Sequence, residues 1–102
     1  MAVDRVRRPR LDNVDEFDGY VETEDKVFLI ETKTTLRSRD VRDFVERVER
    51  YKVRAPRGKT VIPMAIYSIE GENLEKLLAM AKAHGIVLVK HHGEYEFEVV
   101  NQ

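Results

Sequence analysis

The chain has 102 residues, of which 42% are hydrophobic and 36% are charged, with a net charge of −1, so it suits one folded domain rather than a disordered segment. Cysteine is absent, which excludes disulfides and thiolate metal sites and fits a cytoplasmic protein. No apolar run is long enough to span a bilayer, and the first residues lack the apolar region of a secretory signal.

The first third of the chain predicts an arm followed by a β-hairpin. Residues 1–14 are polar and rich in arginine, and we expect them to form an arm or an edge strand. Residues 17–23 alternate and contain many β-formers, and residues 26–34 contain the apolar run Val27-Phe28-Leu29-Ile30. Glu24-Asp25 between these runs predicts a tight turn, although it is not the favoured Asn-Gly type.

Two helices are predicted by apolar residues at three- and four-residue spacing. The first begins at Ser38, taken as its N-cap, and ends before Pro56. Its buried face should consist of Val41, Phe44, Val45, Val48 and Tyr51. The second covers residues 73–84 and ends at Gly85.

Three further strands are expected, over residues 60–67, 86–89 and 95–100. Pro63 indicates a bulge or a strand edge on one side. His91-His92-Gly93 reads as a turn, in which adjacent histidines point opposite ways and do not share a metal ion. In the last strand Tyr95, Phe97 and Val99 alternate with glutamates, which predicts an apolar face turned inward.

The order hairpin, helix, strand, helix, strand, strand predicts a single α/β (α+β) domain over residues 1–102. Its centre should be a mixed β-sheet in which a crossover helix follows the hairpin and two helices flank the sheet. The stretch from Thr32 to Lys59 has ten basic and four acidic residues, a net charge of +6. Such a stretch can attract phosphates, but charge alone favours a solvated helix with internal ion pairs, since basic helix faces are common.

Chemically reactive side chains gather in the hairpin. Glu31 and Lys33 are two residues apart on a strand and therefore point to the same face. With the turn centred on Glu24-Asp25, Asp18 lies opposite Glu31 and Glu16 lies opposite Lys33. We expect the other face of the hairpin to supply the core with Phe17, Val21, Phe28 and Ile30.

Two carboxylates that face each other across strands repel. A hard divalent cation such as Mg²⁺ would remove the conflict, because it binds one or two carboxylates together with water and phosphate oxygens. Lys33 could then orient an attacking water or stabilise the charge of a transition state. The simpler alternative is a surface cluster whose charges compensate one another without any ligand.

Asp18, twelve intervening residues and then Glu31-Thr32-Lys33 after a hydrophobic strand resemble the PD-(D/E)XK nuclease superfamily. Residues 16–51 are similar to uncharacterised archaeal and bacterial members, and weaker similarity continues over residues 79–89. The high charge and the scarcity of Asn, Gln and Cys indicate a thermophilic source. The resemblance implies a restriction-endonuclease-like fold for the chain.

The same resemblance implies roles for individual residues. Asp18 and Glu31 would bind Mg²⁺ or Mn²⁺ with help from the backbone carbonyl of Thr32, and Lys33 would be the catalytic lysine. DNA is the expected substrate, with its phosphates contacted at the start of the first helix by Arg37, Arg39 and Arg42.

The chain departs from the family pattern before the hairpin. It lacks an evident N-terminal helix, and Glu16 is a candidate to replace the acid that such a helix often supplies. Three functions therefore stay open: a Mg²⁺-dependent endonuclease, a non-catalytic nucleic-acid-binding or assembly module that retains the nuclease fold, and a dimerising domain. The last would form a homodimer through the final strand or an uncovered sheet edge.

Overall fold

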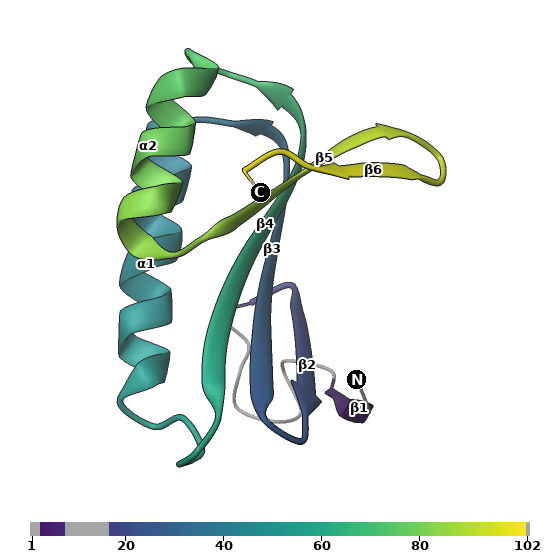
Figure 1. The fold of residues 1–102 in the computed structure, drawn as a ribbon. Coiled ribbons are helices and arrows are strands. Elements are labelled where there is room, and N and C mark those ends of the chain that lie inside the picture. The colour runs from purple at the N-terminus through teal and green to yellow at the C-terminus, as the bar shows by residue number, and fades with distance from the viewer. Residues whose placement is uncertain (1–2, 8–16, 102) are drawn as a thin grey trace.

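The computed structural model describes residues 3–7 and 17–101, with the backbone alone described for residues 3–7. The elements of these parts are β1 (Val3–Arg7), β2 (Gly19–Thr23), β3 (Lys26–Leu36), α1 (Ser38–Lys52), β4 (Thr60–Glu70), α2 (Leu74–His84), β5 (Val87–Gly93) and β6 (Glu96–Val99) (Figure 1). The predicted hairpin, helices and later strands are all present, which confirms the mixed α and β class. No described helix is long and apolar enough to cross a membrane.

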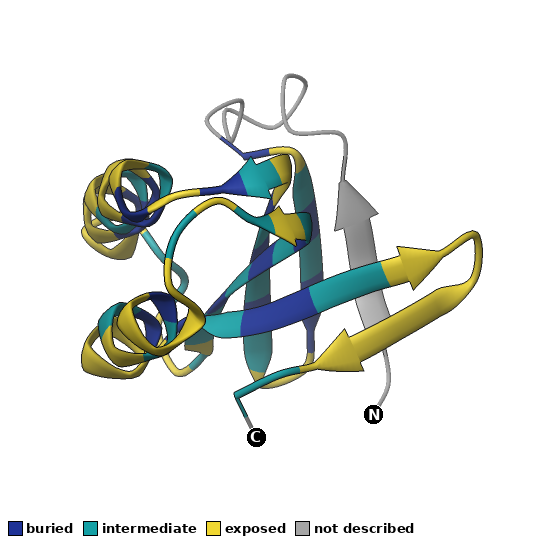
Figure 2. Cartoon of the chain, turned by 90° about the horizontal axis from the view of Figure 1, so that it is seen from above, coloured by how far each residue is buried: buried dark blue, intermediate teal, exposed yellow. Residues whose placement is uncertain are grey.

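The strands form one mixed sheet whose spatial order, β1 to β6, is also the order along the chain. β1, β2 and β3 form an antiparallel meander, β3, β4 and β5 are parallel, and β6 returns antiparallel to β5. α1 and α2 are the two crossovers between the parallel strands. Since both crossovers step in the same direction across the sheet, right-handed connections place both helices on one face, as Figure 2 shows.

β1 lies at one edge of the sheet, paired only with β2 among the described strands. The expectation of an edge strand within residues 1–14 is therefore confirmed for Val3–Arg7. The rest of the expected arm lies outside the described residues, as does Glu16.

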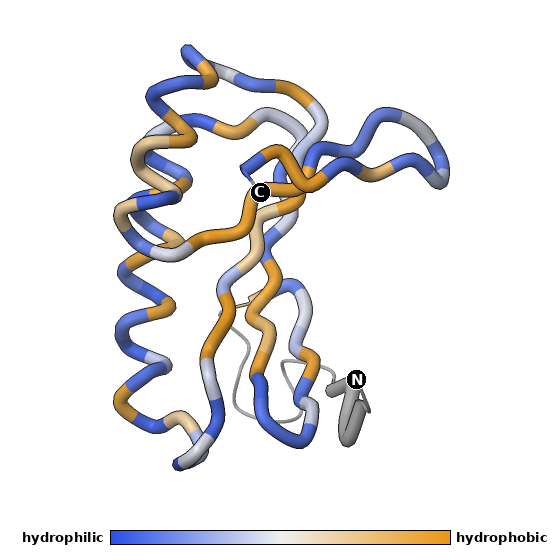
Figure 3. Tube along the Cα trace, viewed as in Figure 1, coloured by the Kyte–Doolittle hydropathy of each residue, from blue (hydrophilic) through white to orange (hydrophobic). Residues whose placement is uncertain are grey.

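The core lies between the sheet and the two helices. α1 buries Val41, Phe44, Val48 and Tyr51, four of the five residues on its predicted face, and α2 buries Leu77 and Ala81. On the sheet they meet Tyr20, Val27, Leu29, Ala65, Tyr67 and Leu88. In Figure 3 the apolar segments follow the central strands, whereas the β5–β6 hairpin is mainly hydrophilic.

The predicted hairpin register is confirmed, but the predicted core face is wrong. Gly19 pairs with Ile30 and Tyr20 with Leu29, so the register places Asp18 opposite Glu31. The helices cover the face that carries Leu29 and Glu31, both of which are buried, whereas Ile30 on the opposite face is half-buried. Apolar residues occupy both faces of the hairpin, so alternation alone did not decide which face the crossover helices would cover.

Val21 and Phe28 share the half-buried state of Ile30, and Phe17 alone of the expected core set is fully buried. Phe17 precedes β2 and reaches the helix side, where its ring packs edge-on against Phe44 at 6.1 Å. The chain therefore bends before the strand begins.

The N-cap of α1 differs from the sequence prediction, whereas the end of α2 and the position of Pro63 agree with it. Arg37, not Ser38, is the N-cap of α1, and Ser38 is the first helical residue. Gly85 caps α2 with φ of 67°, the left-handed conformation that glycine adopts without strain. Pro63 was expected at a strand edge, and the pairing of β4 with β5 indeed begins only at Met64.

The C-terminal hairpin differs most from expectation. His91 to Gly93 belong to β5, and Glu94-Tyr95 form the turn. The hairpin projects away from the helices (Figure 1), and Tyr95 is 91% exposed and Phe97 is 56% exposed. The predicted inward apolar face of the last strand is therefore wrong, because neither helix reaches it.

Candidate functional site

The predicted carboxylate pair lies at the start of β2 and in β3, on the face covered by α1. Asp18 continues the β2–β3 register, and its N–H donates to the carbonyl of Ile30 at 2.9 Å. Its Oδ2 accepts hydrogen bonds from the backbone N–H of Thr32 at 2.8 Å and from the Thr32 hydroxyl at 3.0 Å. Glu31 is buried and shares a side-chain hydrogen bond with Asp18. The structure therefore brings Asp18, Glu31 and Thr32 together as predicted.

Arg47 of α1 completes this group, although the sequence interpretation did not include it. Its Nη2 forms an ion pair with Oε2 of Glu31, and its guanidinium carbon lies 5.6 Å from the centre of the Phe44 ring. Arg47 follows Phe44 by three residues, beside the buried face of the helix. That spacing was visible in the sequence, but using it required knowing that the helix covers the Glu31 face.

The two carboxyl groups have opposite pKa shifts. Burial raises the pKa of Glu31 above its ordinary value of 4.5, and the hydrogen bond with Asp18 adds to the effect, which Arg47 only partly offsets. Burial also acts upward on Asp18, but hydrogen bonds from Glu31 and Thr32 hold the pKa of Asp18 below 3.8. The pair is thus arranged so that Asp18 carries the charge and Glu31 retains a proton more readily.

Lys33 lies on the same face of β3 as Glu31, two residues further along. Its Nζ lies 3.8 Å from Oδ1 of Asp40 in the first turn of α1, and its side chain is 45% exposed. The ammonium is therefore accessible beside the carboxylate pair, with its described ion pair directed to Asp40.

The donor set fits a hard divalent cation. Two adjacent carboxylates are what Mg²⁺ takes from a protein when water and substrate phosphates supply its remaining ligands. Within residues 17–101, no group of three or more His, Cys, Asp or Glu side chains is arranged to hold a metal ion. An ion at this pair would have to share Glu31 with Arg47 or displace the guanidinium.

The start of α1 is less open to phosphate than the sequence suggested. Arg37, Arg39 and Arg42 are all exposed there. The backbone N–H of Arg37, however, donates to Asp40 at 2.9 Å, and the N–H and hydroxyl of Ser38 both donate to Oε1 of Glu72. These hydrogen bonds from Ser38 lower the pKa of Glu72. Phosphate contacts at this end would therefore come from the arginine side chains rather than from these two N–H groups.

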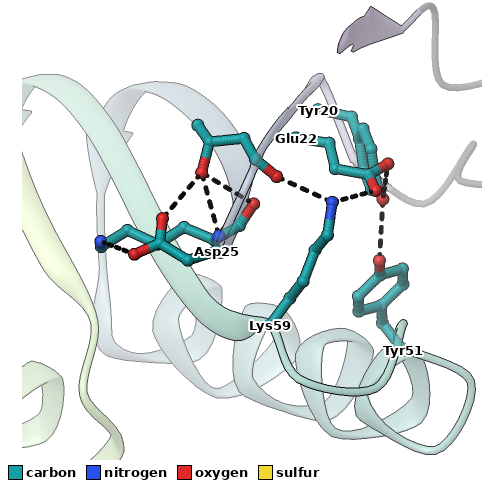
Figure 4. Close-up of polar contacts among 7 residues, drawn as sticks. Tyr20, Glu22, Asp25, Tyr51 and Lys59 are labelled. Atoms are coloured by element: carbon teal, nitrogen blue, oxygen red, sulfur yellow. Dashed lines mark hydrogen bonds and ion pairs between the residues drawn. The ribbon is translucent and has the colours of Figure 1, made fainter. Parts of the chain in front are cut away.

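A second polar cluster ties the end of α1 to the turn end of the hairpin (Figure 4). The hydroxyls of Tyr20 and Tyr51 lie 3.0 Å apart, and Tyr20 donates to Glu22 at 3.3 Å. Lys59 Nζ donates to Oε2 of Glu22 at 2.6 Å and to the carbonyl of Thr23 at 2.7 Å. Tyr20 shares the site face and is a buried core aromatic.

A hollow of about 290 Å³ lies toward the carboxyl ends of β3, β4 and β5, on the face of the sheet opposite the helices. Its lining residues are Thr32, Lys33, Thr34, Ile66, Tyr67, Ser68 and His91. The side chains of Thr32, Thr34, Ile66 and Ser68 alternate along the strands with those of Glu31, Lys33 and Tyr67. The sheet therefore separates the hollow from the side chains of Glu31 and Lys33. The sequence interpretation did not include the hollow, because its walls come from three strands that are distant along the chain.

Comparison with known proteins identifies no relative. No protein-family model matches the chain, and no curated protein or solved structure matches it significantly.

Proposed function

We propose that this chain is a metal-dependent nuclease-like domain that hydrolyses DNA phosphodiester bonds. The observation that carries the proposal is the Asp18–Glu31 carboxyl pair, with Lys33 two residues beyond Glu31 on the same face. Two facing acids on paired strands are unfavourable without a compensating cation, and Arg47 offsets the raised pKa of Glu31 only in part. The restriction-endonuclease-like fold remains part of this proposal.

Each residue has a separate task in the proposed reaction. Asp18 and Glu31 hold Mg²⁺ or Mn²⁺, helped by the backbone carbonyl of Thr32. When bound, such an ion lowers the pKa of a water molecule and neutralises charge on the phosphate. Lys33 orients the attacking water and stabilises the charge that develops on the phosphate oxygens.

The hydrogen bonds around Asp18 support its proposed role as a metal ligand. Thr32 engages Oδ2 of Asp18 through two hydrogen bonds, which fixes the orientation of the carboxylate before an ion arrives. Glu31 is fixed from the helix side by Arg47. A preorganised pair of oxygens costs less to assemble around an ion than two mobile side chains do.

The test is a calorimetric titration of MgCl₂ and MnCl₂ into wild type, Glu31→Gln and Glu24→Gln. Glu24 is an exposed acid in the turn of the same hairpin, so its variant controls for the loss of one charge. We expect binding by wild type and Glu24→Gln, and none by Glu31→Gln. Wild-type protein that binds neither ion, alone or with an uncleavable DNA oligonucleotide, would contradict the proposal.

Cleavage is then measured on linear, branched and single-stranded DNA with Mg²⁺ or Mn²⁺. We expect cleavage by wild type and its loss in Asp18→Asn and Lys33→Met. Binding of the DNA should persist in Asp18→Asn, because this change removes a metal ligand and not a basic contact.

A non-catalytic nucleic-acid-binding module is the second candidate. It is favoured by the Arg47–Glu31 ion pair and the hydrogen bond between the carboxyl groups, which compensate the acids without any ion. This candidate predicts salt-dependent DNA binding through the basic stretch 32–59 that survives EDTA. Loss of that binding on chelation would favour the nuclease instead.

A further inference from the structure

The sheet face turned away from the helices, called the open face below, is apolar and has no cover among the described elements. Both helices lie on the other side of the sheet, as Figure 2 shows. The side chains of the open face alternate along the strands with the buried residues Leu29, Ala65 and Leu88. Those at its centre are all apolar and half-buried: Phe28, Ile30, Ile62, Met64, Ile66 and Val87.

The parallel strands predict a cover on both sides of the sheet. β3, β4 and β5 are parallel, and parallel strands occur mostly in sheets whose two faces are both buried. Their sequences fit this rule, because each contains a continuous apolar run: residues 27–30, 61–66 and 87–89. The helices bury one side of these runs, so the other side requires a second layer.

The centre of the open face is uncharged, although 36% of the residues of the chain are charged. No acid, lysine or arginine alternates onto this face between Phe28 and Thr34, between Ile62 and Ser68, or between Val87 and His91. A nucleic acid would require basic side chains here. An uncharged surface can instead meet an identical surface without repulsion, and interfaces between identical chains are the more apolar kind.

We propose that two copies of the chain associate through their open faces as a two-fold symmetric dimer. In such a contact the same patch of each copy meets its counterpart, and the two sheets pack about 10 Å apart with interdigitated side chains. The inference does not depend on the proposed nuclease function. Glu31 and Lys33 lie on the helix-covered face, so the contact does not cover them.

The size of the open face suits a dimer. At about 4.8 Å between strands and about 3.3 Å per residue, strands β2 to β6 cover roughly 600 Å² before the unevenness of the side chains is included. A stable dimer buries about 800 Å² on each partner. The largest apolar patches left exposed on monomeric proteins measure about 300 to 600 Å², so the open face is large for a monomer and adequate for a dimer.

The border of the open face is also that of an interface. Thr34, Ser68 and His91 line the hollow at the carboxyl ends of the parallel strands, and an apolar centre with a polar rim is the usual arrangement in protein–protein contacts. On the side of β6, Phe97 and Val99 pair with residues of the open face and are 56% and 43% exposed. They extend the apolar surface as far as the edge of the sheet.

The first test is the mass of the protein in solution, measured by light scattering over a range of concentrations. We expect a mass about twice the 11.9 kDa of one chain. Ile66→Lys at the centre and Thr34→Lys at the rim should each weaken association more than about tenfold, because the contact would bury an unpaired ammonium. Val53→Lys adds the same charge at a side chain after α1 that is 90% exposed and should leave the dimer intact.

Thr34→Lys keeps the test decisive if Ile66→Lys does not fold, because Thr34 is exposed in the single chain. Circular dichroism checks the fold of each variant. A wild-type protein that is monomeric up to its solubility limit would overturn the inference. A dimer that survives in every folded lysine variant would also overturn it, since the copies would then meet through another surface.

A second test uses the five isoleucines of the chain, with ¹³C-labelled methyl groups and a soluble gadolinium chelate in the solution. The open-face methyl groups of Ile30, Ile62 and Ile66 should be protected from line broadening in wild type and broadened in monomeric Thr34→Lys. Ile69, which is 53% exposed, and Ile86, which is 2% exposed, supply the two reference levels. Open-face methyl groups broadened as strongly as Ile69 in wild type would show that solvent, not a second copy, covers this face.

Discussion

Arg47 of α1 and Glu31 of β3 form an ion pair in which the arginine side chain is 21% exposed and the glutamate 10%. This contact joins the crossover helix to the carboxylate pair. It gives Arg47 two effects that can be separated by experiment, one on folding and one on cation binding.

Arg47→Met should destabilise the fold by about 2 kcal/mol, because it leaves a largely buried carboxyl group without its cation. Urea unfolding measures this change. Lys52→Met is the matched control, since Lys52 makes an exposed pair with Glu49 on the same helix, and it should cost less than about 0.5 kcal/mol.

The same variant should bind Mg²⁺ more tightly than wild type, because the guanidinium no longer competes for Glu31. Calorimetry on Arg47→Met and Lys52→Met measures this difference. Weaker binding in Arg47→Met would mean that Arg47 positions Glu31 for the ion rather than competing with it.

The hairpin register was predictable because few quantities determine it. Glu24-Asp25 fixed the centre of the turn, and the two-residue period of a strand then placed Asp18 opposite Glu31. The helix face of α1 was predictable for the same reason, since Phe44 and Val48 follow its period. Both features follow from the local periods of strand and helix, which can be read from the sequence alone.

The face of the hairpin that becomes core was not predictable in this way. Leu29 and Ile30 are equally apolar, and the direction of the crossovers decides that Leu29 is buried and Ile30 is not. Arg47 and the hollow likewise depend on elements meeting in space. The exposure of Phe97 follows from the direction of the C-terminal hairpin, which projects away from both helices.

The stability of the protein should depend on pH through Glu31. Its pKa in the folded state is raised above 4.5, so the unfolded chain releases this proton first as the pH rises. The contribution is therefore full below pH 4.5 and is lost as the pH rises through the folded-state pKa. Glu31→Gln removes this titration.

Urea unfolding of wild type and Glu31→Gln across the acid and neutral range tests this effect. We expect wild type to lose stability relative to the variant above pH 4.5. A stability difference that does not vary with pH above 4.5 would show that the folded protein does not raise the pKa of Glu31.

Lys59→Met should destabilise the fold by about 2 to 3 kcal/mol. Lys59 bonds to the buried carboxylate of Glu22 and to the carbonyl of Thr23, and removing it leaves Glu22 without this cation. Lys26→Met is the control, because the Lys26–Asp25 pair of the same hairpin is exposed. Equal losses of unfolding free energy in the two variants would mean that the buried Lys59–Glu22 contact stabilises the fold no more than the exposed Lys26–Asp25 pair does.

The side chain of Asn101, which follows β6, forms two hydrogen bonds with the backbone at the start of β5. Its Nδ2 donates to the carbonyl of Ile86 at 2.7 Å, and its Oδ1 accepts from the N–H of Leu88 at 3.0 Å. Only a side chain with both a donor and an acceptor satisfies these two backbone groups.

Asn101→Asp should therefore cost about 1 to 2 kcal/mol at pH 7, where a carboxylate replaces the donor and faces the carbonyl of Ile86. Part of the loss should be recovered at low pH, because a protonated carboxyl group donates again. Asn101→Ala lacks both groups and should show no such recovery. Urea unfolding of both variants at pH 7 and at about pH 3, near the ordinary aspartate pKa, measures the difference, and identical pH profiles would mean that the donated hydrogen bond to Ile86 contributes nothing.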